Sequence, residues 1–190
     1  MKRRSPTRTV LLVTNGRLTE KEYLQGFKKH VVGRYGGARL TVRVVEGEPR
    51  TVYEEFARNS IFKIYDETWV IIDHDNIDRS SLVSKFVKLG TKKHPVHVIV
   101  SVPCFEVWLT AHYEQVRNYQ DQHDAQRHYA QIAHVRQGKE KHLPEDFPWG
   151  AIVNAAPRSR LAGVPEPSID TQGPCPSTTM PHLMRSLGLL

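Results

Sequence analysis

Two aspartates separated by one residue follow a short apolar run. Residues 69–72 read Trp-Val-Ile-Ile, and Asp73, His74 and Asp75 come directly after them. The run is short, rich in β-branched residues and followed by turn-forming residues, so it predicts a buried strand. Because residues i and i+2 of a strand point to the same side, both carboxylates could converge on one cation. Mg²⁺ is typically held by one or two carboxylates together with waters and substrate phosphates.

The same residues also suit a turn. Asp73 could end the strand, while Asp75 and Asn76 supply oxygens to a turn or to the cap of the next helix. The spacing of the aspartates is compatible with both interpretations, and at this point both stay open.

Two further carboxylates follow other predicted strands. Glu20 comes shortly after Asn15 and the strand at residues 9–14, and Glu106 comes shortly after the strand at residues 96–101. In open α/β sheets the loops at the carboxyl ends of the strands build the ligand site, so we expect these side chains to meet the aspartate pair. The alternative for both glutamates is compensation of the helix dipole in a first helical turn.

Strand and helix patterns alternate along the first 113 residues. This alternation predicts a mainly parallel sheet with helices on both faces, a three-layer α/β core at residues 9–113. We count four strands in it, the last three at residues 40–45, 68–72 and 96–101. Residues 1–8 form a basic tail.

Residues 114–190 predict a helical C-terminal extension. Its first helix is expected at residues 121–136 and a second at residues 149–156, ended near Pro157. A proline-rich loop at about residues 163–177 has no core signal. Residues 177–181 are expected to cap a last helix.

The composition favours a soluble protein with phosphate-bearing partners. The chain has 27 Lys and Arg against 20 Asp and Glu, a net charge of +7. Such a balance favours nucleic acid, although a merely soluble basic surface is the alternative. No apolar run reaches the roughly 18 residues of a membrane span. Two cysteines provide neither a disulfide framework nor a zinc cluster, so we expect a cytoplasmic protein.

Other chemistries have weaker support. The ten histidines are scattered at spacings that match no standard zinc set. His112, on an otherwise apolar helix, is expected to be hydrogen-bonded locally. Cys104 is expected to be a packed thiol rather than a nucleophile. Neither a P-loop nor a glycine-rich dinucleotide fingerprint is present.

Four motifs of the chain form a recognisable combination. They are Val13-Thr14-Asn15-Gly16-Arg17-Leu18-Thr19-Glu20, Trp69-Val70-Ile71-Ile72-Asp73-His74-Asp75, Ser101-Val102-Pro103-Cys104-Phe105-Glu106-Val107-Trp108-Leu109 and Pro176-Ser177-Thr178-Thr179. Together they resemble the RloB-like family over nearly the whole chain. The resemblance implies a Toprim-like core, the metal-binding fold of topoisomerases, primases and OLD-type nucleases. It also implies a link to bacterial restriction and abortive-infection loci, beside an ATPase partner.

The resemblance extends to the site. Toprim domains have a glutamate before a glycine at the end of the first strand and an Asp-x-Asp after a later strand. Here Asn15 precedes Gly16 where the glutamate is expected, and an amide is an uncharged ligand and a poor general base. The implied ligands of Mg²⁺ (or Mn²⁺) are Asp73, Asp75, Glu106 and Asn15, and the implied catalytic carboxylates are Glu20, Asp73, Asp75 and Glu106.

These observations lead to three expectations for function. The first is a metal-dependent, nuclease-like Toprim protein of an anti-phage system that acts on phosphodiester bonds. The second is a catalytically degenerate module that binds nucleic acid or regulates an ATPase partner, and the third is a structural remnant without metal. Asn15 favours the second, whereas the retained Asp73, Asp75 and Glu106 favour the first.

Overall fold

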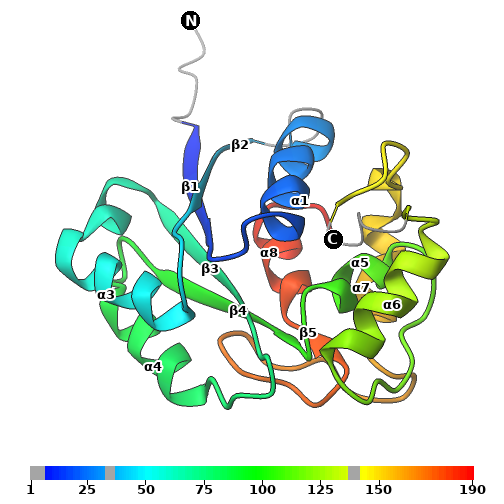
Figure 1. Ribbon diagram of the computed structural model, residues 1–190. Coiled ribbons are helices and arrows are strands. Elements are labelled where there is room, and N and C mark those ends of the chain that lie inside the picture. The colour runs from blue at the N-terminus through cyan, green and yellow to red at the C-terminus, as the bar shows by residue number, and fades with distance from the viewer. Residues whose placement is uncertain (1–6, 33–36, 137–141) are drawn as a thin grey trace, which may run out of the picture.

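A five-stranded sheet forms the centre of the fold (Figure 1). The computed structural model describes residues 7–32, 37–136 and 142–190, so most of the expected basic tail lies outside the described residues. The strand order is β2-β1-β3-β4-β5, with all pairs parallel except β4 and β5. The strands are β1 (Arg8–Thr14), β2 (Ala38–Val44), β3 (Glu67–Asp73), β4 (Val96–Val102) and β5 (Ser177–Thr178).

The expected count of four strands is wrong because β5 joins the sheet. Ser177 and Thr178, expected to cap a helix, instead pair antiparallel with the end of β4. The hydroxyl groups of Ser101 and Thr178 are hydrogen-bonded at 2.9 Å. A strand of two residues is too short to show an alternating pattern, so its pairing is decided by the tertiary structure.

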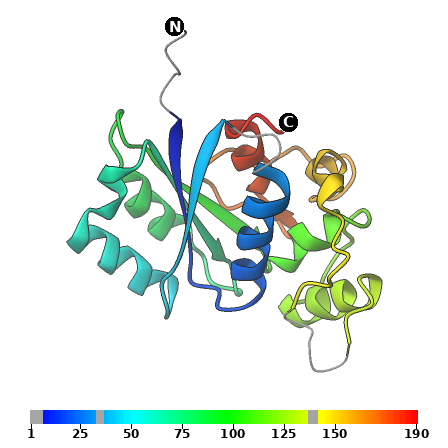
Figure 2. The same cartoon turned by 90° about the horizontal axis from the view of Figure 1, so that it is seen from above.

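Helices cover both faces of the sheet (Figure 2). The central strand β3 sends Trp69 and Ile71 into one apolar cluster and Val70 and Ile72 into the other, so all four are buried. A parallel strand covered on both faces reads as a continuous apolar run, which explains its sequence. On one face lie α3 (Pro49–Asn59) and α4 (Ser80–Leu89), and on the other α1 (Thr19–Phe27), α5 (Glu106–Ala111) and α8 (Met180–Ser186).

The remaining helices pack on α5, beyond the sheet. They are α6 (Gln122–Ile132) and α7 (Ile152–Arg158). The Asp121 carboxylate caps α6 by accepting the Asp124 backbone N–H at 2.8 Å. Pro157 lies inside α7, one residue before its end, rather than after it. Short helical turns are η1 (Lys28–Val32), η2 (Ile61–Ile64) and η3 (Trp149–Ala151). None of the helices in the described ranges is long and apolar enough to cross a membrane.

The proline-rich segment, for which the sequence predicts no core contact, is packed against the sheet. Pro167 and Pro176 are buried. The Asp170 carboxylate accepts the backbone N–H of Val98 at 2.7 Å, so the segment follows the outer side of β4. A Cβ atom at Gly173 would fall 2.4 Å from the Cγ atom of Pro167, so the segment folds tightly on itself. The proline-rich segment is held in part by this polar contact to the backbone of β4. A contact of this kind requires no hydrophobic pattern in the sequence, so the packing was not predicted.

Candidate functional site

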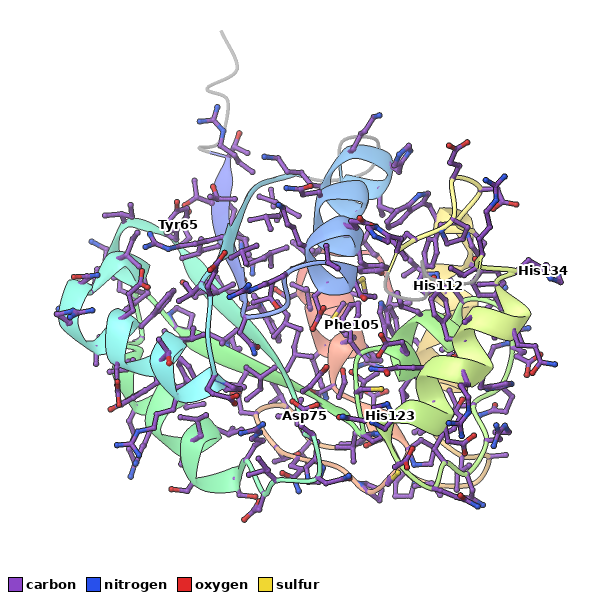
Figure 3. All side chains as sticks on the ribbon, viewed as in Figure 1. Tyr65, Asp75, Phe105, His112, His123 and His134 are labelled. Atoms are coloured by element: carbon purple, nitrogen blue, oxygen red, sulfur yellow. The ribbon has the colours of Figure 1, made fainter. Side chains whose placement is uncertain are left out.

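One pocket of about 500 Å³ contains every predicted site residue. It lies at the carboxyl ends of β1 and β3, and its lining also includes the loop that follows β1 and the start of α6. In Figure 3, Asp75 lies toward the beginning of α6, the helix that carries His123. The structure therefore brings together the five residues expected from the sequence, which are Asn15, Glu20, Asp73, Asp75 and Glu106.

The spacing of Asp73 and Asp75 suggested that both lie on one side of a strand, but only Asp73 belongs to a strand. Asp73 is the last residue of β3, whereas Asp75 lies beyond it with φ of 49°, followed by Asn76 with φ of 57°. This left-handed backbone is the turn that the alternative interpretation describes. The turn is anchored because the N–H groups of His74 and Asp75 donate at 3.0 and 3.1 Å to carbonyl oxygens of Ser101 and Pro103. The Asp75 side chain nevertheless lines the pocket.

The β1–α1 loop brings Glu20 to the same pocket. Glu20 lies in the first turn of α1, and its carboxylate occupies the space that a side chain at Gly16 would need. The side-chain amide nitrogen of Asn15 donates to the Gly47 carbonyl at 3.2 Å, which fixes the amide at the pocket wall. The absence of a side chain at Gly16 therefore leaves room for the Glu20 carboxylate, four residues later.

Glu106 is the first residue of α5 and is 4% exposed. Next to it, Cys104 is buried at the end of β4. Burial raises the pKa of the Cys104 thiol well above its usual range, and the charges of Glu106 and Asp73 raise it further. The raised pKa keeps the sulfur protonated, which agrees with the expected packed thiol.

The carboxyl group of Asp73 is affected by the charges of three other carboxylates. Burial raises the pKa of its carboxyl group well above the usual range, and the charges of Glu20, Glu106 and Asp75 raise it further. Its Oδ1 atom is shielded from solvent and accepts no hydrogen bond within the described ranges. The carboxyl group does accept the backbone N–H of Phe105, which opposes the rise in pKa. The remaining oxygen, Oδ1, is costly to leave without a donor unless the group is protonated or a cation approaches it.

The donor set fits a hard divalent cation. Carboxylate and amide oxygens are the ligands of Mg²⁺ and Mn²⁺, and water or phosphate oxygens complete the shell. The buried, unsatisfied Oδ1 of Asp73 is the atom that such an ion would satisfy. In the part of the chain that the structure describes, no group of three or more His, Cys, Asp or Glu side chains is arranged to hold a metal ion.

Sequence reasoning missed the residues that complete the walls. Gln122 and Gln126, one turn apart on α6, line the pocket from the extension. Arg79, behind the lining, was missed as well: it is 7% exposed, its Nε donates to the Asp73 carbonyl at 3.0 Å and its Nη2 lies 3.6 Å from the Asp75 carboxylate. The opposite charges of Asp75 and Arg79, four residues apart, were a signal for the second of these contacts. The two glutamines gave none, because polar residues on an amphipathic helix usually face solvent.

His112 lies outside the pocket. It is buried among aromatic rings and lies 3.3 Å from the Tyr23 hydroxyl and 3.4 Å from the Pro148 carbonyl (Figure 3). The expected hydrogen bonding is therefore present, but its partners lie 89 and 36 positions away in the chain rather than on the same helix. Other histidines pair separately with carboxylates on different elements, as His97 does with Asp170 and His142 with Glu22.

A family model described as RloB-like protein matches residues 10–187. The chain belongs to the RloB-like family. The match runs from β1 to α8, so it includes every residue of the pocket and confirms the resemblance drawn from the four motifs. The search of curated proteins found no match for this RloB-like chain.

Proposed function

We propose that this RloB-like protein is a Mg²⁺-dependent nuclease with a Toprim-like, three-layer core, acting in the cytoplasm as part of a bacterial anti-phage system. The observation that carries the proposal is the Asp73 carboxylate, whose buried Oδ1 lacks a donor and lies among three other carboxylates of one pocket. A divalent cation, Mg²⁺ or Mn²⁺, would satisfy the Oδ1 atom of Asp73.

Each pocket residue has a role in this proposal. Asp73, Asp75 and Glu106 would hold the cation, for which their side chains have to come closer together than the structure places them, and the Asn15 oxygen would be a weaker, neutral ligand. The bound cation supplies a polarised phosphoryl oxygen and a more acidic water. Glu20 accepts the proton of the attacking water, because its carboxylate reaches the pocket from the first turn of α1.

A run of lysines that starts on α4 supports a nucleic-acid substrate. No Asp or Glu occurs between Asp78 and Glu106. On α4 and the turn after it, the lysines are all exposed. Residues 74–78, which hold Asp75 and Asp78 and are called the acidic loop below, lie between β3 and the start of α4. Lysine side chains bind phosphate oxygens without reading sequence, so these lysines suit a nucleic-acid backbone. The lysines are Lys85, Lys88, Lys92 and Lys93.

The direct test is a cleavage assay. The protein is incubated with single-stranded, double-stranded and structured RNA and DNA, with Mg²⁺ or Mn²⁺, beside an Asp73→Asn/Asp75→Asn variant. We expect metal-dependent cutting that the double variant loses. Asp66→Asn, at the opposite end of β3, is the matched control and should cut normally. Cutting that survives in the double variant would contradict the catalytic role of Asp73 and Asp75.

A second candidate function follows from Asn15. Because a neutral amide replaces the glutamate expected at this position, the pocket could serve binding alone, in a module that recognises nucleic acid and regulates an ATPase partner. Absence of cutting, together with nucleic-acid binding that weakens steeply with salt, would favour this candidate. Calorimetric titration with Mg²⁺ distinguishes the nuclease and the binding module from a structural remnant without metal, because the remnant would bind no Mg²⁺.

A further inference from the structure

Arg79 is a buried arginine beneath the acidic loop. Its Nε donates to the Asp73 carbonyl at 3.0 Å, and its Nη2 lies 3.6 Å from the Asp75 carboxylate. The Nη2 atom is shielded from solvent and has no hydrogen-bond partner within the residues described. Since a shielded guanidinium cannot reach a substrate in the pocket, Arg79 acts on the loop rather than on the substrate.

The backbone of Arg79 is held from the other side by the C-terminal extension. Its N–H donates at 2.8 Å to the side-chain oxygen of Gln172, a residue 93 positions later in the chain. Two residues before Gln172, Asp170 accepts the N–H of Val98 on β4. The proline-rich segment thus fastens the start of α4 to the sheet at the point where the acidic loop ends.

We propose that Arg79 is a positioning residue of the pocket, and that Gln172 holds Arg79 in place. The inference rests on the proposed function, in which Asp73 and Asp75 bind a divalent cation. Asp75 occupies a left-handed turn, so its position depends on external contacts. A planar, permanently charged guanidinium that contacts both aspartates fixes them relative to each other before a cation arrives.

The proposal is tested with Arg79→Met, Arg79→Lys and Gln172→Ala in the full chain. Mn²⁺ binding is measured by calorimetry, and the loop is followed by hydrogen exchange of the amides at positions 74–78. We expect Arg79→Met to weaken Mn²⁺ binding about tenfold or more and to speed exchange in the loop. Arg79→Lys should recover part of the affinity, because it keeps the charge but not the planar fork.

Arg50→Met is the matched control. Arg50 pairs with Glu54 four residues away, the same spacing as Asp75 and Arg79, but this pair is exposed on α3. Its loss should change neither Mn²⁺ binding nor loop exchange. Gln172→Ala covers the case in which Arg79→Met does not fold, since Gln172 is only half-buried. It should weaken Mn²⁺ binding and speed exchange of the Arg79 amide.

The outcomes separate this inference from the proposed function. If the wild type binds Mn²⁺ and both Arg79→Met and Gln172→Ala match it in affinity and exchange, the positioning role is overturned while the metal site stands. If the wild type binds no Mn²⁺ yet Arg79→Met loosens the loop, the positioning role stands and the metal-dependent function fails. A loss of global stability with unchanged exchange at positions 74–78 would also overturn the inference.

Discussion

Gly16 lies against the carboxylate of Glu20: a Cβ atom at position 16 would fall 2.0 Å from the Cδ atom of Glu20. No side chain fits there unless the carboxylate moves. The glycine after Asn15 is therefore required by the placement of an acidic side chain in the pocket. Because the atom that must move is the end of a flexible side chain, the fold can tolerate the change while the site cannot.

Gly16→Ala is therefore expected to lower metal-dependent cleavage by about tenfold or more, because misplacing a catalytic group by an ångström can cost that much. Its free energy of unfolding should change by less than about 1 kcal/mol. Cleavage rate and urea unfolding measure the two effects. Gly150→Ala, where an added Cβ meets nothing within 4 Å, is the control. Equal cleavage by both variants would contradict the role of Glu20.

His112 makes stability depend on pH. Burial lowers the pKa of His112 to about 3, from an ordinary value of 6.5. Between these values the unfolded chain binds a proton that the folded chain does not, so stability falls as the pH falls below 6.5. The slope from this group approaches about 1.4 kcal/mol per pH unit. Its effect fades as the pH rises above 6.5, because His112 then becomes neutral in the unfolded chain as well.

His112→Gln should flatten that slope, since a neutral amide replaces the titrating ring. Urea unfolding at pH 7, 6 and 5 measures the difference, and the variant loses less stability over this range than the wild type. His123→Gln, at an exposed position of α6, is the control and should follow the wild type. An unchanged slope in His112→Gln would show that the ring is accessible to protons in the folded protein.

Asp170 joins the proline-rich segment to β4. Its carboxylate accepts the Val98 backbone N–H at 2.7 Å and pairs with His97 at 2.9 Å. Asp170→Ala leaves a strand N–H without a partner and places alanine at φ of 59°, so we expect a loss of about 1–3 kcal/mol in urea unfolding. Asp170→Asn keeps an acceptor and tolerates this φ, so it should lose less. Equal losses would mean that the hydrogen bond to Val98 contributes little.

The lysines of α4 are expected to bind the phosphate backbone. Lys85→Gln/Lys88→Gln should weaken binding to all nucleic acids alike and reduce the slope of log affinity against log salt by about 2. Lys21→Gln, a single exposed lysine on α1, is the control and should leave the slope unchanged. Filter binding at several salt concentrations gives both slopes. A slope unaffected by the double change would place the nucleic acid elsewhere.

Much of the candidate site could be predicted from the sequence because its residues lie at strand ends. Glu20, Asp73 and Glu106 follow buried strands, and parallel strands present their carboxyl ends at one edge of the sheet. Of the two interpretations of Asp75, the structure shows the turn, since its backbone is left-handed and does not belong to the strand. The pocket still includes it, because the turn folds back over the end of β4.

The sequence by itself determined the strands, most helices and the set of acidic residues, because these depend on local periodicity and on neighbours within a few residues. The tertiary structure alone decided the fifth strand, the glutamines of α6 and the contact between Arg79 and Gln172. Those features depend on hydrogen bonds and packing between residues far apart in the chain. A hydrogen bond between residues 93 positions apart leaves no period in the sequence, so only the folded chain reveals that its C-terminal segment supports the acidic loop.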